Sequence, residues 1–390
     1  MGGAFLRRLG AGSVGVARRG YLLAVETVVI TGASSGVGRA AALAFARAGA
    51  RLVLSSRSGP ALEEVAAECR AARAESGAVA RPGAGKVARP GTGVAARPGA
   101  GKVARPGTGV AARPGAGAVP GVDSGAVARA GAEAGGPGEA EGGVTVVVAD
   151  VTRPDTIEAV AAAAGDRIDV WVHTAAVMAY GRFEDVPADV FDQVVTTDLL
   201  GAATVARVAL ARFRQRGRGV LIFGGSLLGT VVTPYTSSYV TSKWGLRALV
   251  RALRLETRDA PGIHVCLVSP GAVDTPIYRN AANFAGRIGR PPPPIDRAEK
   301  AAAAIVRCAR HPRGTVNVGA ANKLILFGFV ATPALYDVLV GPLMRLAGLS
   351  REKVGPHPGN VFAPPSPDAE AVKGRRRAGP AAALRRGRSG

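Results

Sequence analysis

The sequence predicts one α/β domain in which helices cover both faces of a doubly wound parallel sheet, with a long disordered insertion and disordered basic ends. Short β-branched and aliphatic runs alternate with segments of helical periodicity, which is typical of a parallel sheet. The 54 glycines and 27 prolines among 390 residues exceed the usual share. Part of the chain is therefore expected to stay unfolded.

The expected strands are short apolar runs, and the expected helices between them are alanine-rich or carry one apolar face. In the second helix, for example, Leu62, Val65 and Cys69 share a face. Strands are expected at 27–30, 51–54, 144–149, 170–173, 219–223, 263–268 and 315–318. Helices are expected at 40–48, 60–75, 187–200, 202–215 and 238–258. One domain then spans 21–321, interrupted by residues 77–143.

The interruption at 77–143 is expected to be a disordered insertion on a helix-to-strand connection. The unit GAGKVARPGTGVAARP starts at Gly83 and again at Gly99. Its regularly spaced prolines stop a helix, and the neighbouring glycines weaken a strand. Expansion of a repeat explains this segment more simply than a dedicated function does.

Most of the net charge of +22 lies outside the expected domain. Residues 1–20, 77–118 and 350–390 carry +4, +7 and +6, so the folded part is only mildly basic. The repeats have no aromatic side chains for base stacking, so nucleic-acid binding is the weakest of the functions considered, and no specific nucleic acid is expected.

Three widely separated cysteines exclude a disulfide scaffold and a zinc ribbon, and no metal site is expected. They are expected to be buried in a reducing compartment, which favours a cytoplasmic protein, with membrane association as an alternative.

A glycine-rich turn, TGASSGVG at 31–38, follows the first expected strand and precedes a helix. Glycines at such a turn let the backbone approach a pyrophosphate at the helix N-terminus. The second strand ends in Ser56 and Arg57 rather than in an acid. Arginine suits a 2′-phosphate, so NADP(H) is the preferred cofactor and NAD(H) the alternative.

Ser226, Tyr239 and Lys243 are the candidate chemical groups. Tyr239 and Lys243 are four residues apart in an expected helix, so they share a face. A phenol with a pKa near 10 needs a cation to act as an acid or base at neutral pH, and Lys243 can supply it. A serine hydroxyl can hold a carbonyl oxygen beside the phenol.

Together these motifs resemble the short-chain dehydrogenase/reductase family over 21–76 and 144–321, which implies one Rossmann-like domain and a homodimer or homotetramer. TGASSGVG matches the family's cofactor turn, Asp150-Val151 its adenine contact, YVTSK its catalytic segment and PGAVDT its nicotinamide loop. The cofactor residues so implied are Gly32, Ser34, Ser35, Gly36, Val37, Gly38, Ser56, Arg57, Asp150, Val151, Thr174, Ala175, Ala176, Tyr239, Lys243, Pro270, Gly271, Val273 and Thr275.

The resemblance also implies a role for each catalytic residue. Tyr239 would be the general acid in carbonyl reduction and the base in alcohol oxidation. Lys243 would lower the pKa of Tyr239 and bind the nicotinamide ribose, and Ser226 would polarise the substrate oxygen.

The sequence departs from the family pattern at two places. The family's Asn-Asn-Ala-Gly is replaced by a segment that begins with His173, which is expected to be structural rather than catalytic. Asp198 stands where the family has an asparagine that completes a proton relay; an ionised aspartate there would raise the pKa of Lys243. These departures motivate an alternative, a cofactor-binding regulator without turnover.

The substrate pocket is expected to be apolar, which suits a hydrophobic ketone or secondary alcohol. Its expected lining is Met178, Tyr180, Leu227, Tyr235 and Ile277. Residues 322–349 are expected to be helical, and only Asp337 is charged within 324–341. That run is too interrupted to span a membrane, so a cover over the pocket is preferred. Dimer packing, or peripheral membrane contact through 324–348 and the basic tail, are the alternatives.

Overall fold

A computed structural model describes residues 26–77 and 141–364. The expected N-terminal extension, nearly all of the expected insertion and the end of the basic tail lie outside the described residues.

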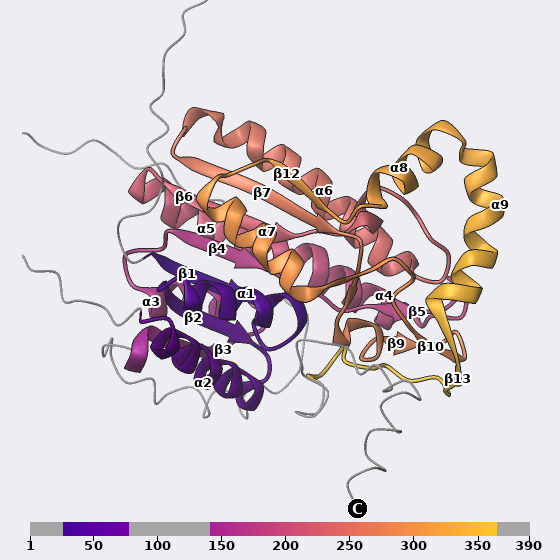
Figure 1. Cartoon of the computed structure of the whole chain (residues 1–390), viewed down its shortest axis with the longest axis horizontal. Helices are drawn as coiled ribbons and strands as arrows, with labels where there is room; N and C mark the ends of the chain where they lie inside the picture. The colour runs from indigo at the N-terminus through magenta and orange to yellow at the C-terminus, as the bar shows by residue number, and fades with distance from the viewer. Residues whose placement is uncertain (1–25, 78–140, 365–390) are drawn as a thin grey trace, which may run out of the picture. The chain divides into compact units, whose positions relative to one another are not determined.

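The described residues form the expected parallel sheet, with strand order β12-β7-β6-β4-β1-β2-β3 (Figure 1). Its strands are β1 (Thr27–Thr31), β2 (Arg51–Ser56), β3 (Val144–Val148), β4 (Val170–His173), β6 (Gly219–Gly224), β7 (Ile263–Pro270) and β12 (Thr315–Val318). The order reverses beside β1, which pairs with β2 on one side and β4 on the other. The crevice at this reversal is where open α/β sheets bind ligands.

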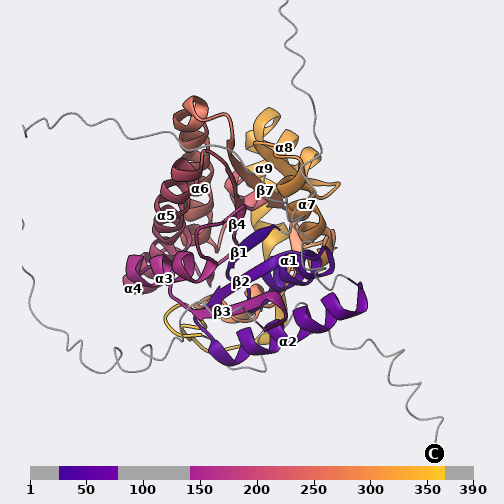
Figure 2. The ribbon, with the colours of Figure 1, turned by 90° about the vertical axis from the view of Figure 1, so that its left-hand side faces the viewer.

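Helices cover both faces of the sheet (Figure 2). They are α1 (Gly36–Arg47), α2 (Gly59–Glu75), α3 (Pro154–Ala164), α4 (Ala188–Val195), α5 (Gly201–Arg216), α6 (Ser237–Glu256), α7 (Ala298–Arg310), α8 (Asn322–Ala331) and α9 (Pro333–Leu343). α3 and α7 are absent from the predicted elements. The buried face of α7 consists largely of alanine, which gives a weaker signal than large apolar residues, and α3 buries two alanines beside Ile157 and Val160.

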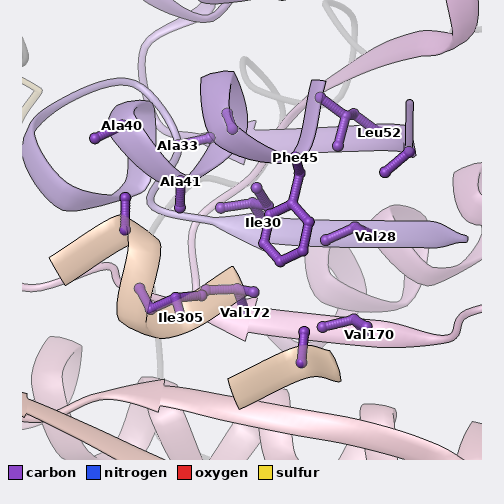
Figure 3. Close-up of a cluster of buried hydrophobic side chains, with 14 of the residues drawn as sticks. Val28, Ile30, Ala33, Ala40, Ala41, Phe45, Leu52, Val170, Val172 and Ile305 are labelled. Atoms are coloured by element: carbon purple, nitrogen blue, oxygen red, sulfur yellow. The ribbon is translucent and has the colours of Figure 1, made fainter. Parts of the chain in front are cut away.

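Successive strand residues point to opposite faces and build two cores. Val28 and Ile30 of β1 pack with α1, α2 and α7, whereas Val29 packs with α3, α5 and α6. Figure 3 shows the first core, where Phe45 of α1 lies over Val28 and Ile30. The three cysteines are buried, as expected.

One continuous helix, Ala188–Arg216, is long and apolar enough to cross a membrane. It comprises α4, a π-helical turn at Thr196–Leu200 and α5, and half of its most apolar window is buried. Because Val205 and Phe213 pack into the second core, this helix is weak evidence for a membrane span.

Short strand pairs organise the region beyond β7. β8 (Ala272–Asp274) pairs with β11 (Ile295–Arg297), β5 (Ala179–Tyr180) with β9 (Ala282–Asn283), and β10 (Arg287–Gly289) with β13 (Leu349–Lys353).

The expected disorder from residue 350 onward is wrong for residues 350–364. β13 pairs antiparallel with β10, His357 bridges to Asn283, and Val361 is fully buried. These contacts join segments about 60 to 80 residues apart, so the local composition of 350–364 gave no sign of them.

Candidate active site

One cavity of about 560 Å³ lies at the carboxyl ends of the sheet strands. All 19 predicted cofactor residues line it, including the glycine turn after β1, Arg57 after β2 and the Pro270–Gly271 segment after β7. Residues far apart in sequence meet here because the parallel strands end at the same edge of the sheet.

The glycine turn is shaped to leave the start of α1 open. Gly32 has a φ of +84°, and a Cβ there would lie 2.6 Å from Ala175 Cα. A Cβ on Gly38 would overlap the carbonyl oxygen of Gly32 and lie 2.6 Å from Thr174 Oγ1. The Ser35 side chain does not cap α1, and no acid lies in its first turn. The helix N-terminus therefore directs its positive dipole at the cavity, which fits a pyrophosphate.

Arg57 is held at the end of β2 by the segment that follows β13. Its guanidinium donates to the carbonyl oxygens of Asn360 at 2.7 Å and Val361 at 3.2 Å. Both Arg57 and Asn360 line the cavity. Asn360 and Pro364 thus form part of the cavity wall near Arg57, a contribution that the sequence did not indicate.

Ser226, Tyr239 and Lys243 come together in the same cavity. Ser226 follows β6, and α6 carries the other two on one face. Lys243 Nζ lies 5.2 Å from the Tyr239 ring centroid and donates to the Gly224 carbonyl at 3.4 Å. Ser226 Oγ accepts the Leu228 N–H at 3.1 Å, which fixes the hydroxyl at the cavity wall.

Burial raises the pKa of Tyr239 above its usual value, and the charge of Asp198 raises it further. A hydrogen bond with Ser226 opposes this shift. The net direction is opposite to the lowering expected from Lys243. Tyr239 is therefore a neutral phenol at neutral pH, with a proton that it can donate in acid–base chemistry.

Asp198 lies behind Lys243 and does not line the cavity. It sits in the π-helical turn, where Oδ1 accepts the Val177 N–H at 2.7 Å and Oδ2 lies 3.5 Å from Lys243 Nζ. Burial raises the pKa of Asp198 to about 6, while the charge of Lys243 and the Val177 N–H lower it. In this geometry Asp198 contacts Lys243 and stays outside the cavity lining.

His173 links two central strands. It faces Thr31 across the β1–β4 pair, with its Nδ1 2.9 Å from Thr31 Oγ1. Burial, together with the charge of Lys243, lowers the pKa of His173 to about 3. The neutral ring favours the predicted structural role. Thr174 adds a second link by donating to the Gly32 carbonyl at 3.2 Å, so strand-bridging bonds persist without the family's asparagine.

Four of the five predicted substrate-pocket residues line the cavity: Met178, Tyr180, Leu227 and Ile277. Tyr235 does not line it. Tyr235 packs in the apolar cluster beside Met178 and Tyr180, and its carbonyl accepts the Gly181 N–H at 3.0 Å. Proximity in sequence to Tyr239 therefore did not predict its position.

The far end of the cavity is apolar and is built by residues that the predicted pocket omits. It is lined by Ile325, Leu335, Tyr336, Leu339, Leu343 and Met344 from α8, α9 and the following turn. The apolar run at 324–341 was the available signal, and its predicted placement over the pocket agrees with this lining.

Two family models match the chain. The model described as short chain dehydrogenase matches residues 26–83, and the model described as Enoyl-(Acyl carrier protein) reductase matches residues 126–290. The gap between the two matches falls within the low-complexity segment.

Curated relatives agree with these matches. The chain is 35% identical over 263 residues to 1-deoxy-11-beta-hydroxypentalenate dehydrogenase of Streptomyces exfoliatus, covering 66% of this chain and 70% of the relative. It is 31% identical over 212 residues to the Bacillus subtilis protein called uncharacterized oxidoreductase YxnA, covering 51% of this chain and 57% of that relative. The chain thus spans a little over half the length of the Bacillus protein.

Solved structures share the fold. Levodione reductase has a TM-score of 0.52 at 20% identity, covering 78% of this chain and 99% of its own. A 3-ketoacyl-(acyl-carrier-protein) reductase from Brucella melitensis, complexed with NADH, has a TM-score of 0.50 at 19% identity, covering 75% and 96%. The family matches and the Streptomyces relative establish that this chain belongs to the short-chain dehydrogenase/reductase family.

Proposed function

We propose that the protein is an NADP-dependent oxidoreductase that reduces a hydrophobic ketone to a secondary alcohol. One observation carries the proposal: Ser226, Tyr239 and Lys243 lie in the same cavity as the open N-terminus of α1 and the apolar end lined by α8 and α9. We call this apolar end the substrate chamber. The polar end suits a dinucleotide, and the apolar end suits a nonpolar substrate.

Each residue has a definite task in this reaction. The N-terminus of α1 binds the pyrophosphate, and the Pro270–Thr275 segment holds the nicotinamide carboxamide. When bound, NADPH would supply the hydride that the carbonyl carbon accepts. Ser226 orients the carbonyl oxygen, Tyr239 gives that oxygen its phenolic proton, and Lys243 binds the nicotinamide ribose. Tyr239 is protonated at neutral pH, so it has the proton that reduction requires.

The proposed preference for NADP(H) rests on Arg57. Its two backbone partners hold the guanidinium at the cavity wall. No acid stands at the end of β2 to bind two free ribose hydroxyls and repel a 2′-phosphate.

The substrate class is supported by the lining and by two relatives. The chamber includes Met178, Ile277, Leu339 and Leu343. The Streptomyces relative is named for 11-beta-hydroxypentalenate, and another, from Eggerthella lenta, is a 3beta-hydroxysteroid dehydrogenase. NADPH-dependent reduction of a ketone panel tests this assignment. Bulky apolar ketones are expected to give higher kcat/KM than small polar ones, and the reverse order would reject the substrate class.

Replacing Asp198 by asparagine is expected to change the pH dependence of alcohol oxidation. The substitution removes the charge that raises the pKa of Tyr239, so the basic form of Tyr239 forms at lower pH. The pH optimum of kcat/KM should fall by about one unit. An inflection near pH 6, where Asp198 itself titrates, should also disappear.

The matched control is Asp296→Asn, which removes a carboxylate from a surface ion pair with Lys300. Its pH profile should match that of the wild type. If the Asp198→Asn profile also matches the wild type, Asp198 is not electrostatically coupled to Tyr239.

A further inference from the structure

The most exposed apolar surface in the described part of the chain lies on α8, α9 and the turn Met344–Gly348. We call it the α8–α9 surface. Its side chains are each more than half exposed: Leu324, Phe327, Val330, Leu335, Val338, Leu339, Leu343 and Leu346. Contiguous apolar patches of this kind on a folded protein mark docking sites for proteins or membranes.

The opposite side of the helix pair is fixed to the domain. Phe329 packs edge-on against Trp244 of α6, and Tyr336 packs edge-on against Phe329. The Tyr336 hydroxyl donates to the Val232 carbonyl at 2.7 Å. In Figure 1, α8 and α9 stand to one side of the sheet. Helices α8 and α9 are thus apolar both on the side that packs against the domain and on the exposed α8–α9 surface.

The α8–α9 surface is continuous with the substrate chamber. Leu335, Leu339 and Leu343 line the cavity and are each more than half exposed. The same three side chains therefore belong to both the chamber wall and the outer surface. An apolar molecule could pass between the two without crossing a polar rim at these residues.

Charge around the surface favours an anionic partner. Lys323, Arg345, Arg351 and Lys353 are exposed beside it, against the acids Asp337 and Glu352. The sequence beyond residue 364 adds seven basic and two acidic residues. A helix pair with an apolar face and basic flanks has the chemistry that binds the interface of an anionic bilayer. A second copy would instead bring like charges together.

We propose that the α8–α9 surface docks on anionic lipid membranes, with α8 and α9 lying along the headgroup boundary. We further infer that apolar substrates reach the chamber from the bilayer past Leu335, Leu339 and Leu343; this second step rests on the proposed function.

The test is sedimentation of the full chain with vesicles of phosphatidylglycerol and phosphatidylcholine in equal parts. The wild type should bind, and binding should weaken at high salt and on vesicles of phosphatidylcholine alone. The triple variant Phe327→Glu, Val338→Glu, Leu346→Glu should bind at least about tenfold less. Leu255→Glu, which charges a similarly exposed leucine of α6, should bind like the wild type.

Thermal melting and NADPH binding of the triple variant should match the wild type, which excludes misfolding as the cause of lost docking. Failure of the wild type to bind anionic vesicles would overturn the proposal, as would equal binding by the triple variant. Self-association without lipid that the triple variant abolishes would also overturn it, in favour of a second copy. Vesicle binding requires no turnover, so this result is independent of the proposed oxidoreductase activity.

Discussion

Replacing Tyr239 by phenylalanine is expected to abolish NADPH-dependent reduction while leaving NADPH binding nearly unchanged. Phenylalanine keeps the ring that packs in the apolar cluster with Met178 and Tyr180. It removes only the hydroxyl that bonds Ser226 and that carries the transferred proton. Loss of a general acid costs about 10²–10⁴-fold in rate. Steady-state rates and fluorescence titration with NADPH measure the two effects separately.

Tyr278→Phe is the matched control, because Tyr278 is a partly buried tyrosine of the same apolar cluster and lines the same cavity. Its kcat should stay within about tenfold of the wild-type value, since no proton is assigned to it. A comparable loss in both variants would indicate a packing effect. A wild-type protein that binds NADPH and reduces no carbonyl would instead favour the cofactor-binding regulator.

Gly38→Ala is expected to destabilise the fold and to abolish cofactor binding. The new methyl group would overlap the Gly32 carbonyl oxygen and crowd Thr174. Because the overlap is with backbone, relief requires α1 to move away from the end of β1. Overpacking of this kind costs about 1–3 kcal/mol of unfolding free energy. Denaturant unfolding and NADPH titration measure the two losses.

Gly341→Ala is the control for the glycine substitution itself. A Cβ at Gly341, in α9, meets no atom within 4 Å. Alanine also has a higher helix propensity than glycine, so this variant should be as stable as the wild type or slightly more stable. If Gly38→Ala binds NADPH normally, the first turn is not the pyrophosphate site.

The sheet and the glycine turn were predictable because their signals are local. Each strand is a short apolar run, and the turn at 31–38 combines glycines with a helix start. The missed α7 buries mainly alanine, whereas the missed α3 buries Ile157 and Val160 as well as two alanines. The contacts of residues 350–364 depend on partners such as Arg57, some 300 positions away. No local pattern encodes such pairing.

The pKa shift of Tyr239 was less predictable than the position of its side chain in the cavity. The spacing of Tyr239 and Lys243 indicated a cation beside the phenol, and the lysine is there. The direction in which the pKa of Tyr239 shifts depends instead on burial and on the charge of Asp198, which lies in a π-helical turn. Both are properties of the assembled fold.

Thermal unfolding with NADPH and NADH, on the wild type and on Arg57→Ala, tests the central claim that the cavity binds NADP(H). NADPH at about 100 times its Kd should stabilise the wild type by about 2.7 kcal/mol. NADH at the same concentration should stabilise the wild type less than NADPH does. In Arg57→Ala, NADPH and NADH should stabilise the fold equally. Absence of stabilisation by either cofactor would contradict the account.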